Sequence, residues 1–389
     1  ADLQKTLLRR EAIHMPDHQY VTNTKTRNFQ NMRKILVEWL VEVVEDTNMK
    51  CETLFLAVNY LDRYLSKCLV SRDELQLVGI TAILVASKHE ELAPQSVQNL
   101  VIMTDNTYEH SNVLSMECSL LQTLDYWLTV LTPLKTLELL RLHTLQDTRF
   151  GDLAKGDMMM YRGLTSTIWI FASYLLELAL SEYSAVNIQP SRLAAAAALL
   201  ALHNFVLEWE EGSQFGTEQI ENHDDPGAAQ DDRVDRLQRF SALTLLMHHI
   251  MEMMGPAVAS SAVNSQNGSS EVTRESNGEE ISTHESSAGS VPPGPAGGSV
   301  SLSPIAGKEW EEFVGEVETT VLLLHSYHSN VATTFATCRK YSNNKRLRVS
   351  LILPRPQHSV RTFLSQLSEL RSGNVSGAIA GKGEVALNQ

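Results

Sequence analysis

Two stretches of this sequence are apolar around the whole helical circumference, and they constrain the fold more than any other feature. The first is LQLVGITAILVASK at residues 75–88, and the second is LAAAAALLAL at residues 193–202, about 115 positions further along. A helix without a polar face must be enclosed by other elements. The sequence therefore predicts two helical units, each built around one enclosed helix and related as a long-period duplication.

Amphipathic segments surround the enclosed helices. Apolar side chains recur at intervals of three and four between Met32 and Val43, the period of a helix with one buried face. Ser71 and Glu74 have the spacing of a capping box just before the first enclosed helix. Further helices are expected over 53–65, from Pro94 onward, over 113–124, 134–143 and 157–180, and from Trp310 to about 337. The chain is expected to be all-α.

Residues 207–307 interrupt the second unit. They hold 16 acidic and 4 basic residues, so most of the net charge of −14 lies there, and 255–307 is dominated by Ser, Gly, Asn, Ala and Pro. Such a composition buries too little apolar surface to offset chain entropy, so this insertion is expected to be mostly disordered. Apolar spacing within it allows one amphipathic helix over 237–254, which either docks on the body or binds a partner. The rest of the chain is close to neutral, which disfavours a nucleic-acid binder.

The sequence carries no motif for catalysis. It has no Gly-rich nucleotide loop, no HExxH and no GxSxG. Glu90–Glu91 and Glu311–Glu312 are carboxylate pairs, but acid/base chemistry needs carboxylates that face each other across a cleft. These pairs are expected to be solvated helix ends, and we expect no enzymatic activity and no cofactor.

Cysteine usage and hydropathy place further limits on the chain. The four cysteines lie far apart and form no CxxC pair, so we expect buried, inert thiols and no metal site. The longest uncharged apolar runs fall short of the roughly 20 residues of a membrane-spanning helix. We therefore expect no membrane as a partner, and the charges within the first 14 residues separately predict that no signal peptide is present.

Four consecutive segments of the first unit resemble the cyclin box. MRKILVEWLVEV at 32–43 is close to the family hallmark MRAILVDWLVEV. The likeness continues through ETLFLAVNYLDRYLS at 52–66, LQLVGITAILVASKHEE at 75–91 and DNTYEHSNVLSMECSLLQTL at 105–124. The pattern is similar to the mitotic A/B group, and TPL at 132–134 favours the B-type. Residues 310–354, which end in YSNNKRLRVSLILP, resemble the last helices and the C-terminal extension of a second box.

The resemblance implies two tandem five-helix cyclin boxes with an N-terminal helix and a C-terminal extension. The implied parts are an N-terminal arm (1–26, helical over about 2–14), a first box (27–130), a second box (131–206 and 308–356), the insertion (207–307) and a C-terminal tail (357–389). It also implies a function. Proteins of this family activate a cyclin-dependent kinase, control mitotic progression in the nucleus and cytoplasm, and have no active site of their own.

The resemblance further implies a kinase interface. In the family, a Lys of an ASK-EE motif and a Glu of an ME motif contact the kinase, and here these are Lys88 and Glu117. An ammonium group offers three donors for free carbonyls at a helix end, and a carboxylate pairs with it or accepts backbone N–H bonds. His89, which stands where the family has an aromatic residue, and Leu121 complete the implied interface.

A second implied surface is a docking patch for RxL-type substrate or inhibitor peptides. Its residues are Met32, Ile35, Leu36, Trp39, Glu42, Leu75 and Gln76. An exposed apolar groove beside one carboxylate suits an Arg followed two residues later by a Leu. Ile35 in particular has a second interpretation, which is packing in the core. Lys34 replaces the family's Ala and adds a charge next to the patch.

Two other functions are compatible with the same fold. A cyclin-fold transcription factor would bind DNA and polymerase, but it usually carries basic promoter-facing residues and an N-terminal zinc ribbon, and this sequence has no such ribbon. A scaffold would use the docking patch without activating a kinase. The presence of both Lys88 and Glu117 favours the kinase activator over the scaffold.

Overall fold

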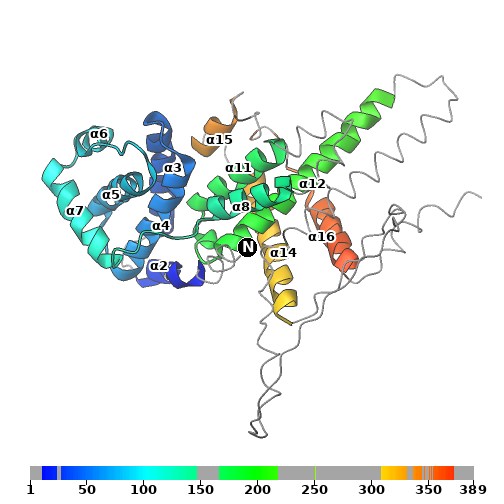
Figure 1. Cartoon of the computed structure of the whole chain (residues 1–389), viewed down its shortest axis with the longest axis horizontal. Coiled ribbons are helices and arrows are strands. Elements are labelled where there is room, and N and C mark those ends of the chain that lie inside the picture. Colours follow the sequence, from blue (N-terminus) through cyan, green and yellow to red (C-terminus); the bar gives the residue numbers. More distant parts are fainter. Residues whose placement is uncertain are drawn as a thin grey trace, which may run out of the picture.

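The computed structural model describes residues 11–23, 28–146, 166–217, 250, 308–330, 336–343, 346, 350, 352 and 354–371. Within these residues every regular element is a helix, which confirms the predicted all-α class (Figure 1). The helices fall into two groups that lie side by side. Each group has its own apolar core, which confirms the prediction of two helical units.

The first unit is built around an enclosed helix. Its helices are α3 (Phe29–Asp46), α4 (Cys51–Lys67), α5 (Arg72–Glu90), α6 (Val97–Met103) and α7 (His110–Thr123). All four of the others pack on α5, whose residues 77–87 are buried without interruption. Because α5 has no polar face along this stretch, only enclosure keeps it out of water.

The ends of two helices are set by local capping. Ser71 and Glu74 form the expected capping box at the start of α5, with the Ser71 hydroxyl donating to Glu74 Oε2 at 2.8 Å. The short helix expected from Pro94 begins instead at Val97. Ser96 precedes it, and its hydroxyl accepts the Asn99 N–H at 3.2 Å. This bond satisfies one of the free amides of the first turn and so fixes where the helix begins.

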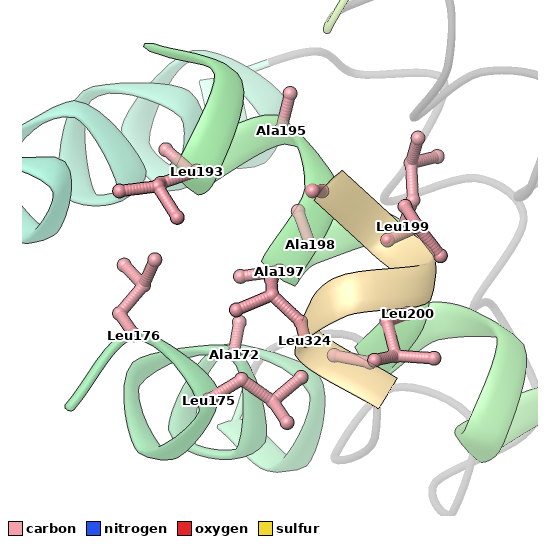
Figure 2. Packing of buried hydrophobic residues seen from close by; sticks show 14 of the residues in the cluster. Ala172, Leu175, Leu176, Leu193, Ala195, Ala197, Ala198, Leu199, Leu200 and Leu324 are labelled. Atoms are coloured by element: carbon pink, nitrogen blue, oxygen red, sulfur yellow. The ribbon is translucent and has the colours of Figure 1, made fainter. Parts of the chain in front are cut away.

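The second unit repeats this plan with different side chains. Its helices are α8 (Pro133–Gln146), α11 (Ile168–Ser181), α12 (Pro190–Thr217), α14 (Lys308–Asn330), α15 (Ala336–Tyr341) and α16 (Gln357–Arg371). The enclosed helix is α12, which packs on α8, α11, α14 and α16. Residues Ala194–Ala198 are completely buried. Figure 2 shows side chains of α11, α12 and α14 meeting in this core, among them Ala172, Ala197 and Leu324.

Three segments differ from expectation. Helix α12 continues past residue 206 to Thr217, into the insertion predicted to be mostly disordered; residues 207–211 contain no Gly or Pro, and the helix then passes through Gly212 and Gly216. Helix α16 lies in the predicted tail, where Val360, Phe363 and Leu364 form an apolar stripe that is buried in the second core. The described part of the predicted N-terminal helix is a 3-10 turn, Glu11–His14, followed by the short α2 (Tyr20–Asn23).

Much of the insertion lies outside the described residues. Of the segment 237–254, Ile250 alone is described, and it is buried in the second core. Residues 218–249 and 251–307 are outside, as are residues 147–165, where the helix expected over 157–180 would begin.

A buried hydrogen-bond network around an ion pair of the first unit joins the two units. Arg33 on α3 donates through Nε and Nη2 to both carboxylate oxygens of Asp62 on α4, at 2.7 Å each. Its Nη1 donates to the Leu180 carbonyl at the end of α11, at 2.9 Å, and Tyr20 donates its hydroxyl to Asp62. Since both charged side chains are almost fully buried, this network fixes the end of α11 against the first unit.

A second buried network links α15 to the first unit. Lys340 Nζ lies 3.0 Å from both oxygens of Glu177 on α11 and 3.1 Å from Glu45 Oε1 on α3. Burial alone lowers the pKa of Lys340, but the neighbouring acidic groups, Glu177 foremost, outweigh it and raise the pKa. The lysine therefore stays charged, and α15 is held on α3.

Candidate interaction surfaces

The structure brings Lys88 and Glu117 together on the surface of the first unit. Lys88 lies in the last turn of α5 and Glu117 on α7, and the two helices pack directly. Lys88 Nζ lies 2.6 and 2.8 Å from the two oxygens of Glu117. The lysine side chain is 46% exposed and the glutamate 12%. A cation at a helix C-terminus also complements the helix dipole.

Apolar side chains flank this ion pair. Leu114, Glu117 and Leu121 are spaced by three and four along α7, so they share one face of the helix. Leu114 is 40% exposed, and Leu121 is half-buried against the first core. Leu92 follows the end of α5 and is fully exposed, and the predicted interface residue His89 is exposed as well. The surface combines a charged pair with accessible apolar groups, as a partner-binding surface does.

The loop after Lys88 is fixed by two carboxylates. Glu91 Oε1 accepts the Lys50 N–H at 2.7 Å and the Thr53 hydroxyl at 2.5 Å. Lys50 Nζ also donates to the carbonyl and carboxylate of Glu90, at 2.8 and 2.9 Å. The sequence suggested that Glu90 and Glu91 are simply solvated, and the structure shows instead that both accept hydrogen bonds from the start of α4. They tie the end of α5 to the start of α4, which holds Lys88 in place.

The predicted docking patch is only partly open to solvent. Ile35 is 62% exposed and Glu42 is exposed, whereas Met32, Trp39 and Gln76 are half-buried. The inclusion of Leu36 and Leu75 was wrong, because both are buried in the first core.

The packing of α3 on α5 explains this division. Leu36 lies against Gly79 of α5 so closely that a Cβ there would meet the leucine side chain at 2.9 Å. Ile35 is the next residue round the helix and points away from α5, so its interpretation as a core residue was also wrong.

Charged residues at the patch have partners in the second unit. Glu42 accepts a hydrogen bond from Arg339 of α15, and Lys34 donates to Glu182 beyond the end of α11. Lys34 is consequently not a free charge beside the patch. No sequence pattern pointed to these pairs, because their members stand 297 and 148 positions apart.

The described side chains bear on three other kinds of site. They contain no group of three metal-ligating residues, and none of the described helices is both long and apolar enough to cross a membrane. The four cysteines are free thiols, and Cys338 is buried. Cys118 is exposed, so the expectation that every thiol is buried was wrong.

Comparison with known families now identifies the two units. The family description "Cyclin, N-terminal domain" matches residues 2–129, and "Cyclin, C-terminal domain" matches residues 160–224. The chain belongs to the cyclin family. The C-terminal match passes residue 206, in keeping with the length of α12. The domain limits 1–26, 27–130, 131–206, 308–356 and 357–389 stay predictions.

Plant cyclins are among the relatives of this chain. It is 36% identical over 207 residues to Cyclin-A1-4 of Oryza sativa subsp. japonica. It is 38% identical over 200 residues to Cyclin-A1-1 and 39% identical over 194 residues to Cyclin-B2-2, both of Arabidopsis thaliana. These matches cover 53%, 51% and 49% of this cyclin, and 54%, 41% and 41% of the relatives.

The relatives confirm the resemblance to the mitotic A/B group, and the preference for the B-type stays a prediction. The matches span about half of the relatives' own lengths or less. Among solved structures, a viral cyclin from herpesvirus saimiri is 16% identical with a TM-score of 0.43, over 64% of this chain and 97% of that one.

Proposed function

We propose that this cyclin is the regulatory subunit of a cyclin-dependent protein kinase and activates it to control mitotic progression in the nucleus and cytoplasm. The catalytic subunit binds the surface around Lys88 and Glu117, together with His89 and Leu121. The observation that carries the proposal is the exposed Lys88–Glu117 ion pair, which joins two packed helices at the positions that resemble the family's kinase contacts.

Activation requires a conformational change in the partner and not chemistry in this chain. The αC helix of a kinase must move inward so that its Glu pairs with the β3 Lys, and the activation loop must leave the substrate site. A rigid surface drives this change if it binds the active conformation more tightly than the inactive one. The enclosure of α5 and the bonds of Glu91 to Lys50 and Thr53 supply that rigidity.

The ion pair has a clear chemical role at such an interface. Lys88 offers three donors to free carbonyls at the end of a kinase helix, while Glu117 holds the lysine in place or accepts backbone N–H bonds. The pair loses water when the partner binds, so truncation of one member costs about 2–5 kcal/mol of binding energy. This loss corresponds to roughly 30-fold to several-thousand-fold weaker binding.

The docking patch is the second part of the proposal. Exposed Ile35, half-buried Met32 and Trp39, and the Glu42 carboxylate lie on one side of α3. Apolar groups beside a carboxylate fit an RxL-type substrate or inhibitor peptide, whose Leu packs on the apolar part and whose Arg pairs with the acid. The patch brings such substrates to the kinase.

The test is kinase activation in a purified system. The full chain is mixed with each of a panel of cyclin-dependent kinase catalytic subunits, and histone phosphorylation is measured for the wild type and for Lys88→Ala/Glu117→Ala. The control is Glu138→Ala/Arg141→Ala, which removes a partly exposed ion pair from α8. We expect the first double variant to lose activation while its helical circular dichroism is unchanged, and the control to keep it. Activation retained by Lys88→Ala/Glu117→Ala would remove the interface assignment.

A further inference from the structure

A row of three carboxylates on α3 meets the second box. Glu38, Glu42 and Glu45 are spaced by four and three residues, so they lie along one face of the helix. Each binds a group in or next to α15. The partners are, in the same order, the amide N–H of Ala336 at 3.0 Å, the guanidinium of Arg339 and the ammonium of Lys340 at 3.1 Å.

The middle contact differs from its neighbours in exposure. The Lys340 side chain is 1% exposed, and burial raises the pKa of Glu38. The side chains of Arg339 and Glu42 are instead 60% and 46% exposed. Helix α15 is therefore anchored on both sides of Arg339, by the Ala336 N–H and by the Lys340 side chain, while the ion pair that Arg339 makes remains open to water.

Glu42 also borders the proposed docking patch. Ile35 precedes it by seven residues and Trp39 by three, which places the three side chains next to one another on α3. Glu42 is the one carboxylate among the seven predicted patch residues. The Arg of a docking peptide would have to pair with this group, and Arg339 already does so.

We propose that Arg339 is a built-in competitor for the docking patch. It pairs with the carboxylate that an incoming arginine needs, so binding of an arginine-containing peptide requires its side chain to swing away while α15 stays in place. The inference rests on the docking role in the proposed function. It adds that Arg339 regulates the binding of peptides at that site. Because the pair is exposed, its removal should change peptide affinity by about two- to five-fold, most clearly at low salt.

The test compares two peptides on four forms of the full chain. One fluorescent peptide carries Arg-x-Leu, and the other has Ala in place of the Arg. Binding is measured by anisotropy for the wild type, Arg339→Ala, Glu42→Gln and Arg361→Ala, a control that removes an exposed arginine from α16. We expect Arg339→Ala to bind the Arg peptide two- to five-fold more tightly and the Ala peptide unchanged. Glu42→Gln should weaken the Arg peptide alone, and Arg361→Ala should change neither.

The other outcomes separate this inference from the proposed function. An unchanged affinity of Arg339→Ala for the Arg peptide, or an equal gain for both peptides, would overturn the competitor role alone. A gain that persists in Arg339→Ala/Glu42→Gln would overturn it as well, because the released carboxylate would not be the cause. Failure of every form to bind either peptide would overturn both the docking role and the competitor role. It would leave the kinase-activating role untouched, because kinase activation is measured in a separate experiment.

Discussion

The two boxes enclose the same kind of helix and fill the space around it in opposite ways. In the first box the enclosed helix α5 brings large side chains, and Ile80, Ile83 and Leu84 are completely buried. In the second box the enclosed helix α12 brings methyl groups from Ala194–Ala198, and its neighbours supply the volume, among them Phe171 and Tyr174 of α11. A helix that is apolar on all sides is thus predicted to be enclosed by other helices. The volume of its side chains decides whether the enclosed helix or its neighbours fill the core.

The boxes also divide their polar groups differently. The Lys88–Glu117 pair lies open on the first box. In the second box, Lys340 and Glu177 form an ion pair whose side chains are at most 1% exposed, and Lys340 also contacts Glu45 of the first box. We infer that the first box presents the binding surface and that the second braces it.

The largest expected effect concerns the link between the boxes. Asp62→Ala should lower the free energy of unfolding by about 3–5 kcal/mol, because it leaves Arg33 charged and buried without its partner. Urea denaturation measures this loss. Asp125→Asn is the control, since Asp125 pairs with Lys67 while 83% exposed, and it should cost less than about 1 kcal/mol. Equal losses for the two variants would mean that Asp62 does not compensate a buried charge where Arg33 contacts the second box.

The next effect tests the core of the first box. Ile83→Ala should lower the free energy of unfolding by about 2–5 kcal/mol, because it opens a cavity around a completely buried side chain. Ile83→Leu keeps the volume and should cost less than about 1.5 kcal/mol. Urea denaturation of both variants measures the two losses. Equal losses for Ile83→Ala and Ile83→Leu would contradict close packing around α5.

The same leucine introduced into the second box should be harmful. Ala196→Leu should lower the free energy of unfolding by about 1–3 kcal/mol, because the space around α12 is already filled by its neighbours. The measurement is the shift in the urea midpoint relative to Ile83→Leu. A stabilising Ala196→Leu would show that the second core has room to spare and would break the contrast between the boxes.

The smallest predicted effect depends on pH. Glu52 lies in the first turn of α4 and accepts a hydrogen bond from the Thr132 hydroxyl at 2.7 Å, next to the segment that connects the boxes. Burial raises its pKa to about 7 from an ordinary value of 4.5, although the Thr132 bond opposes the change. The folded protein therefore holds this proton more tightly than the unfolded chain, and stability falls as pH rises from 4.5 through 7.

Glu52→Gln removes this titration and keeps an acceptor for Thr132. It should raise the free energy of unfolding by about 1–3 kcal/mol at pH 8, and the gain should disappear as pH falls toward 4.5. Urea denaturation at the two pH values measures it. A difference that does not change with pH would contradict the assignment.

Local and periodic patterns predicted much of the fold. The enclosed helices follow from side chains without a polar face, and the capping box follows from two residues three positions apart. Helix α16 shows the limit of such patterns. Its apolar stripe of Val360, Phe363 and Leu364 is short and flanked by polar residues, and only the tertiary contact with the second core makes it a stable helix.

The candidate sites were predictable only in part. Lys88 and Glu117 were found through motifs, and the structure pairs them. The family resemblance assigned Ile35 and Leu36 to the same patch, although neighbours on a helix point in different directions and, of the two, only Ile35 is exposed. The pairing of Glu42 with Arg339 depends on how one box sits against the other, which no local pattern encodes.

The proposed kinase interface is tested most directly by a hydrogen-exchange footprint of this cyclin mixed with a cyclin-dependent kinase catalytic subunit that it activates. We expect slower exchange at the end of α5, residues 88–92, and along α7, residues 114–121, with no change along α14 (Lys308–Asn330) of the second box. Protection confined to the second box, or an active complex without protection at α5 and α7, would contradict it.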